Sequence, residues 1–249
     1  MKKTIGIVGG IGPYAGLDIV EKIFDNTVAV ADKDHVPVIL HSVPELIPDR
    51  TEYILGKSSQ NPSIGIIESI KNLNNAGANV ISIACNAAHS PQIYLEIKKG
   101  VENLDLSLVS IIDVTVGFIK KQKSIDKVAV LSITGTNKSR VYHNAFNAND
   151  IDVIEIDDIV QEKLHDSIWN SEYGIKAFSN PIKNEARESI LEIISLCITK
   201  GAKAIILGCT ELPLAIKENF INSVPIIDAS NLLARALIKI VNPKKLKET

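Results

Sequence analysis

One pattern occurs twice in the chain, as Gly77-Ala78-Asn79-Val80-Ile81-Ser82-Ile83-Ala84-Cys85-Asn86 and as Gly201-Ala202-Lys203-Ala204-Ile205-Ile206-Leu207-Gly208-Cys209-Thr210. In both copies a short apolar run leads from a glycine to a cysteine, which precedes a small polar residue. Short runs of this kind are typical of buried strands in a parallel sheet. Because the strand end is duplicated together with its thiol, two sulfurs can face one another. This suggests proton transfer from two sides.

The duplication extends beyond the cysteine segments. The offset that carries Cys85 onto Cys209 also carries residues 5–12 onto 129–136, so each half begins with a strand and a glycine-bearing turn. We therefore expect two similar lobes, one formed by residues 1–112 with 228–249 and the other by residues 113–227. Ligands of open parallel sheets bind beyond the carboxyl ends of the strands, so we expect the active site in the cleft between the lobes.

Short β-branched runs alternate with longer amphipathic stretches along the whole chain, which predicts the α/β class with mostly parallel sheets flanked by helices. The predicted strands are 4–8, 36–41, 80–84, 108–112, 127–132, 152–156, 204–207 and 225–228. The predicted helices are 14–30, 61–76, 91–103, 115–122, 139–149, 181–200 and 229–241.

Composition excludes several classes of protein. The 249 residues are 45% hydrophobic and carry a formal charge of −2 without a long basic block, which argues against nucleic acid as a partner. No signal-peptide pattern or run of transmembrane length is present, so we expect a cytoplasmic protein without a membrane partner. Three cysteines without CxxC pairs favour reduced thiols over disulfides or a zinc site.

The first turn, Gly10-Ile11-Gly12-Pro13-Tyr14-Ala15, matches the GxGxxA pattern of dinucleotide sites. Pro13 removes a backbone N–H where a phosphate would be held, and no acidic residue clearly ends the second strand. A tight strand-to-helix turn is the simplest interpretation. We favour a turn whose exposed N–H groups, at Gly10 and Gly12, bind a carboxylate.

Cys85 and Cys209 each precede a predicted helix start, where the helix dipole would lower the thiol pKa. Asn86 and Thr210 are residue types that cap helices. A lone cysteine is usually a core residue, and Cys197 fits that description because it lies on an apolar helix without a counterpart in the other half. The duplication favours a reactive role for the other two.

Four segments together resemble the aspartate/glutamate racemase superfamily and are nearest to its aspartate racemase branch. They are Gly9-Gly10-Ile11-Gly12-Pro13, Ile47-Pro48-Asp49-Arg50-Thr51, Ala84-Cys85-Asn86-Ala87-Ala88-His89 and Leu207-Gly208-Cys209-Thr210-Glu211-Leu212-Pro213-Leu214. The resemblance implies an isomerase that racemises a small acidic amino acid without pyridoxal phosphate or metal. One cysteine thiolate would remove the α-proton and the other thiol would protonate the opposite face. A homodimer is expected from the resemblance alone.

The resemblance also implies the substrate contacts. Arg50 would bind the distal carboxylate through its planar guanidinium, and Lys176 aligns with a second cationic ligand. A solvated surface position is the alternative for each of these two. The remaining contacts would come from turns that stabilise charge on the α-carboxylate. These turns contain Gly10, Gly12, Asn86, Ala87, Thr134, Gly135, Thr136 and Thr210.

Three departures bear on the substrate. Gly9-Gly10 and Glu211 stand where glutamate racemases usually carry Asp-Ser and His, which favours aspartate over glutamate. Ala87 replaces a threonine whose hydroxyl would bind substrate, a loss of about 0.5–1.5 kcal/mol. His89 is expected to be structural. Hydantoin racemisation, maleate isomerisation and non-catalytic binding of an amino acid or nucleotide remain as alternatives, although Arg50 argues against a hydantoin.

Overall fold

The computed structural model describes residues 3–248, which form two sheets that both consist mainly of parallel strands. The first sheet has the order β2-β1-β3-β4, with bounds Val38–Ser42, Ile5–Gly9, Val80–Ile83 and Ser107–Val109. The second has the order β6-β5-β7-β9-β8, with bounds Asp152–Val153, Lys127–Leu131, Ala204–Leu207, Val224–Asp228 and Phe220–Ile221. Only β8 runs antiparallel to its neighbour among these strands. The repeated strands β3 and β7 therefore occupy equivalent places in the two sheets.

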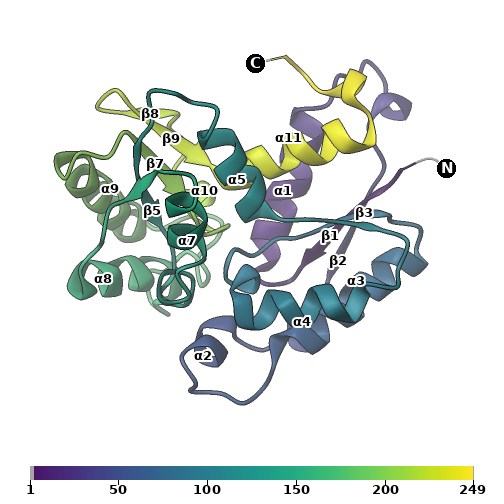
Figure 1. The fold of residues 1–249 in the computed structure, drawn as a ribbon, viewed down its shortest axis with the longest axis horizontal. Helices are drawn as coiled ribbons and strands as arrows, with labels where there is room; N and C mark the ends of the chain where they lie inside the picture. Colours follow the sequence, from purple (N-terminus) through teal and green to yellow (C-terminus); the bar gives the residue numbers. More distant parts are fainter. Residues whose placement is uncertain (1–2, 249) are drawn as a thin grey trace.

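Helices cover both sheets (Figure 1). Around the first sheet lie α1 (Pro13–Asp25), α3 (Pro62–Asn75), α4 (Pro91–Val101) and α11 (Ala229–Val241). Around the second lie α5 (Ile111–Ile119), α6 (Thr134–Lys138), α7 (Val141–Asn147), α8 (Asp158–Trp169), α9 (Asn184–Thr199) and α10 (Leu212–Ala215). The short α2 (Arg50–Ile54) projects from the first sheet toward α6.

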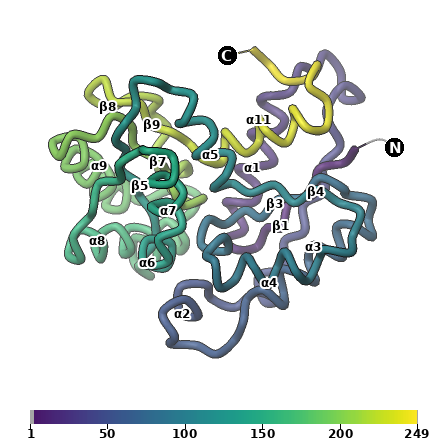
Figure 2. Tube along the Cα trace, viewed as in Figure 1, coloured from purple at the N-terminus to yellow at the C-terminus, as the bar shows by residue number. Residues whose placement is uncertain are grey.

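The C-terminal helix returns to the beginning of the chain. Helix α11 packs along α1, so the yellow and purple segments lie side by side in Figure 2. Helix α11 also contacts α5, which follows the last strand of the first sheet. The division of the chain at 112/113 and 227/228 stays a prediction.

Strand side chains alternate between two apolar clusters, as the period of two requires. Ile81 and Ile205 belong to one cluster, whereas Val80 and Ala204 belong to the other. Each cluster contains residues of both sheets, so the two lobes share continuous apolar packing. This packing fixes the positions of the carboxyl ends of β3 and β7 relative to each other.

Several predicted elements differ from the structure in their bounds, and two differences have a clear physical reason. A strand was expected over 108–112, but Ser110 caps α5 by accepting a hydrogen bond from the Asp113 amide at 3.2 Å, so a helix begins at Ile111. Helix α8 was not predicted, although Asp157 supplies its cap by accepting from the Val160 amide at 3.0 Å. Both errors come from side-chain caps that override weak apolar periodicity. None of the helices in residues 3–248 combines the length and the apolar character that crossing a membrane requires.

Candidate active site

The two cysteine segments meet between the sheets. Cys85 follows β3 and Cys209 follows β7, and both side chains are buried. The Thr210 hydroxyl donates a hydrogen bond to the carbonyl oxygen of Ala84 at 3.1 Å. The residue after one cysteine is therefore bonded to the residue before the other, and the predicted juxtaposition of the two motifs is present.

Cys209 lies beside a carboxylate. Its Sγ donates to Oε2 of Glu211 at 3.0 Å. Burial raises the pKa of the Cys209 thiol well above its ordinary value, and the negative charge of Glu211 raises it further. The expectation that a helix start lowers this pKa is wrong for Cys209, because α10 is a single turn and an anion lies closer.

Asn86 and Thr210, which were predicted to cap helices, make different hydrogen bonds in the structure. Asn86 makes no side-chain cap at the following 3-10 turn (Ala87–His89), and its Oδ1 instead accepts from the Tyr142 hydroxyl at 2.7 Å. The Thr210 hydroxyl bonds to Ala84 as described. Nδ2 of Asn86 is buried and has no hydrogen-bond partner among residues 3–248. A donor is thus available next to Cys85.

Arg50 is buried rather than solvated. Asp49 caps α2 through the Glu52 amide at 2.7 Å and so fixes the start of the helix that carries Arg50. Nη1 of Arg50 donates to the Pro48 carbonyl at 3.1 Å, whereas Nε has no partner within the described chain. Burial opposes its charge, but Cys85 and Asp49 beside it raise the pKa of Arg50 above its ordinary value. The guanidinium therefore lies near the Cys85 thiol.

Lys176 forms an ion pair with Glu211. Nζ of Lys176 donates to Oε1 of Glu211 at 2.6 Å and lies 5.0 Å from the centroid of the Trp169 ring. Burial disfavours the charge on Glu211, but Lys176, the hydrogen bond from Cys209 and then Arg50 lower its pKa below the ordinary value. Burial likewise opposes the charge on Lys176, and Glu211 raises the pKa of Lys176 above its usual range. Both groups are charged at neutral pH.

The two sulfurs consequently have unlike surroundings. Cys85 faces the cation of Arg50, whereas Cys209 faces the anion of Glu211. The sequence suggested that the copies differ because of Ala87, which is buried in an apolar cluster. The larger electrostatic difference comes from Glu211, which stands two residues after its cysteine.

The first glycine turn borders this cluster. A Cβ at Gly12 would lie 3.0 Å from Oε1 of Glu211 and 3.5 Å from Nζ of Lys176, so a larger residue would crowd the ion pair. Gly10 has φ +80°, which favours glycine. A cavity of about 300 Å³ is lined by this turn together with Arg50, Lys176 and Glu211. The volume suits a small ligand.

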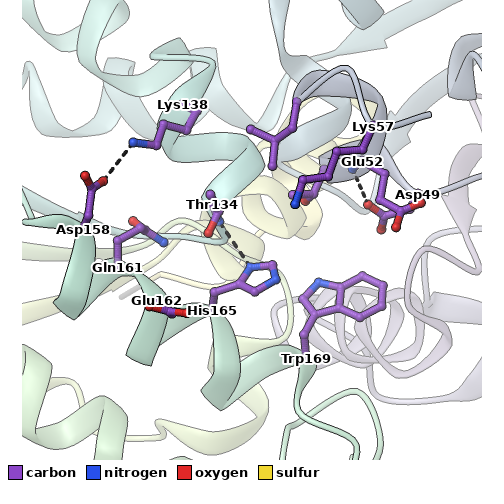
Figure 3. A pocket seen from close by; sticks show the side chains of 12 residues that line it. Asp49, Glu52, Lys57, Thr134, Lys138, Asp158, Gln161, Glu162, His165 and Trp169 are labelled. Carbon is purple, nitrogen blue, oxygen red and sulfur yellow. Dashed lines mark hydrogen bonds and ion pairs between the residues drawn. The ribbon is translucent and has the colours of Figure 1, made fainter. Parts of the chain in front are cut away.

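Thr134 faces a different cavity, of about 610 Å³ (Figure 3). Its backbone N–H donates to Nδ1 of His165 at 3.4 Å, and Trp169 lines both this cavity and the smaller one. Gly135 packs directly against Thr51, and Thr136 is buried. The structure therefore brings Arg50 and Lys176 together at the smaller cavity and places the cysteines near them, whereas Thr134 lines the larger cavity.

The other two side chains that could react, Cys197 and His89, lie in surroundings typical of structural residues. Cys197 is buried, which raises its pKa to about 11. Burial lowers the pKa of His89 to about 4, and its neutral ring bonds through Nδ1 to the Cys85 carbonyl at 2.9 Å. Within residues 3–248, no three His, Cys, Asp or Glu side chains converge as metal ligands would.

Sequence reasoning missed the contacts of three residues in this site. Glu211 was noted only as a departure from a family pattern, although its place directly after Cys209-Thr210 was a usable signal. Trp169 is the only tryptophan in the chain and was not singled out. Tyr142 has no local signal, because only the fold brings it to Asn86.

Comparison with known proteins places this geometry in context. A family model described as Asp/Glu/Hydantoin racemase matches residues 8–237. The Picrophilus torridus aspartate racemase is 32% identical and superimposes with a TM-score of 0.82, over 98% of this chain and 96% of that chain. An aspartate racemase homologue from Pyrococcus horikoshii is 26% identical, with a TM-score of 0.72 over 97% and 99% of the two chains. An uncharacterised protein of Pectobacterium carotovorum is 32% identical over 111 residues, which are 45% of this chain and 69% of that protein. The two-lobed α/β arrangement is shared with these structures.

Proposed function

The chain belongs to the Asp/Glu/hydantoin racemase family, and we propose that it racemises aspartate, or a closely related acidic amino acid, without a cofactor. Family membership and the likeness to an aspartate racemase support an amino-acid racemase. The choice of an acidic substrate and of the two cysteines as proton carriers is our proposal.

One arrangement carries this proposal: two buried thiols, one from each sheet, adjoin a cluster that contains two cations. Cys85 lies by Arg50, and Cys209 is connected through Glu211 to Lys176. Cations close to two potential acid–base groups suit an anionic substrate that exchanges a proton on either side.

The proposed reaction transfers two protons. A thiolate of one cysteine takes the α-proton, so its S–H bond forms as the Cα–H bond breaks. The thiol of the other cysteine then gives its proton to the opposite face of Cα and becomes a thiolate. The negative charge that develops on the α-carboxylate needs donors, and Nδ2 of Asn86 and the backbone N–H groups of the Gly10–Gly12 turn are suited to supply them.

Arg50 and Lys176 favour a second carboxylate on the substrate. Both line the cavity of about 300 Å³, and Nε of Arg50 has no partner in residues 3–248. A guanidinium binds a carboxylate through two parallel hydrogen bonds, which a substrate without the distal carboxylate could not form.

Chiral product analysis tests the proposal. Single enantiomers of a panel of amino acids are incubated with the protein alone in heavy water, with maleate and a 5-substituted hydantoin included as comparison substrates. We expect the opposite enantiomer of aspartate to appear with deuterium at Cα. Activity on maleate or the hydantoin but on no acidic amino acid would refute the choice of substrate.

Three matched serine variants test the roles of the thiols. Cys85→Ser and Cys209→Ser are each expected to lower the racemisation rate by about a hundredfold or more, since a hydroxyl is a much weaker acid than a thiol. Cys197→Ser is the control and retains activity, because this cysteine lies on α9 away from the cluster. Full activity in either of the first two variants rules out the two-thiol mechanism.

A further inference from the structure

Both carboxylate oxygens of Glu211 are engaged in the cluster. Oε2 accepts from Sγ of Cys209 at 3.0 Å, and the Thr210 hydroxyl, which donates to Ala84, lies 3.3 Å from the same oxygen. Oε1 accepts from Nζ of Lys176 at 2.6 Å. Glu211 is only 4% exposed, so these contacts take the place of water. A single carboxylate thus bridges a proposed proton carrier and a proposed substrate ligand.

A buried thiol needs a proton acceptor before it can act as a base. The Cys209 thiol is 5% exposed, which limits the access of a buffer base, and hydroxide is scarce at neutral pH. The Sγ–H group already points at Oε2 of Glu211. A carboxylate in hydrogen-bond contact meets the geometric requirement for a general base.

We propose that Glu211 is a catalytic residue that accepts the proton of Cys209, and that substrate promotes this transfer by drawing Lys176 toward its own carboxylate. The inference rests on the proposed function of the same site. In the step, the Sγ–H bond of Cys209 breaks and an Oε2–H bond of Glu211 forms. A thiol and a carboxylate become a thiolate and a carboxylic acid, and the net charge is unchanged.

Lys176 explains why the transfer depends on substrate. With Lys176 bound, the Glu211 carboxylate is stabilised as an anion and is a poor proton acceptor. When a substrate carboxylate also binds Lys176, the stabilisation of the Glu211 anion weakens and Glu211 becomes more basic. After turnover toward one enantiomer, Cys209 carries the α-proton and Cys85 is the thiolate, and Glu211 returns its proton to Cys85 through solvent on product release.

The test compares the wild type with Glu211→Gln and Glu211→Asp across pH 6 to 10. The charged and titratable groups that face Glu211 are Cys209, Lys176 and Arg50, and loss of the Glu211 charge lowers the pKa of Cys209 and of Lys176 in the glutamine variant. Glutamine keeps the size of the side chain but cannot accept a proton. We expect kcat of Glu211→Gln to fall about a hundredfold near pH 7 and to recover by about tenfold per pH unit as hydroxide replaces the missing acceptor. Glu211→Asp keeps a carboxylate and retains part of the activity.

Binding and folding are measured separately from turnover. Succinate, a dicarboxylate without an amino group, is expected to stabilise wild type and Glu211→Gln alike in a thermal-shift assay. The matched control is Glu218→Gln, which removes another ion-paired glutamate, bonded to Arg187 outside the cluster, and retains wild-type kcat.

The outcomes separate this inference from the proposed function. A wild-type protein that racemises no acidic amino acid refutes the proposed function. An active wild type with an equally active Glu211→Gln variant refutes the role of Glu211. Loss of activity in Glu211→Gln with no recovery at high pH, together with lost succinate binding, would make Glu211 a structural residue and also refute the inference.

Discussion

The Thr210 hydroxyl donates a hydrogen bond to the carbonyl oxygen of Ala84 at 3.1 Å, and this bond joins the two cysteine segments across the lobes. Both residues are buried, so the bond is shielded from competing water. Because each partner is next to a cysteine, a change at this contact alters the spacing of the two thiols. The lobes are therefore coupled at the place where the proposed chemistry occurs.

Arg50→Lys is predicted to lower kcat/KM for aspartate by about a hundredfold. An ammonium cannot form the paired hydrogen bonds of a guanidinium, and hydrogen bonds to charged groups contribute about 1.5–3 kcal/mol each. Steady-state kinetics measures the loss. Arg187→Lys serves as the control, since Arg187 pairs with Glu218 away from the cluster, and it should change kcat/KM less than twofold. Equal effects of the two variants would contradict a substrate-binding role.

Ala87→Thr is predicted to lower KM for aspartate by about two- to tenfold, because it restores a hydroxyl that can donate to substrate at about 0.5–1.5 kcal/mol. Ala87 is only 1% exposed, so the added atoms also crowd its apolar neighbours and lower the melting temperature. Ala88→Thr is the matched control, being fully buried and adjacent. It should be destabilised without any decrease in KM.

Gly135→Ala is predicted to destabilise the protein by about 1–3 kcal/mol, because its Cβ would lie 2.7 Å from Oγ1 and 2.9 Å from Cα of Thr51. The clash separates α6 from α2 and displaces Arg50, so kcat/KM should fall as well. Chemical denaturation and kinetics measure both effects. Gly117→Ala is the control within α5, where a Cβ meets nothing within 4 Å. It should be neutral or slightly stabilising.

Lys176→Met is predicted to destabilise the protein by about 3 kcal/mol near pH 7, because it leaves the buried Glu211 carboxylate without its main cation. In the wild type the pKa of Glu211 is below its ordinary value, so its contribution to stability is present above about pH 4.5 and is lost as pH falls through the lowered value. In the variant, Glu211 binds a proton at higher pH. The difference in melting temperature between the two proteins should therefore shrink as pH falls from 7 to 4, and a difference independent of pH would contradict the ion pair.

The α/β class and the paired cysteine strands could be predicted because they depend on local patterns. Buried parallel strands are near-continuous apolar runs, and a repeated run predicts a repeated strand. The start of α5 was predicted incorrectly because the Ser110 side chain caps the helix. A single polar residue hardly changes the apolar periodicity from which a helix is predicted. Arg50 could be identified from its segment, whereas its burial against Cys85 could not.

The surroundings of Cys209 were predicted incorrectly for a related reason. A helix start was expected to favour thiolate, but the one-turn α10 contributes less than the charge of Glu211 at 3.0 Å. Adjacency in the sequence shows that Glu211 is near Cys209, but it does not show the direction of the Glu211 carboxylate. Lys176 and Gly12 determine that direction, and they lie far away along the chain.

The sequence by itself determined the repeated strands, the two thiols at their ends and the family to which the chain belongs, because each follows from residues that are near one another in the chain. Only the tertiary structure decided that Cys85 lies near a cation and Cys209 beside an anion, and that Thr134 lines a separate cavity. Those relations depend on the direction of side chains, which the fold sets and the order of residues does not show. In the buried cluster, with water largely excluded, the distance and charge of each neighbour govern where a proton resides.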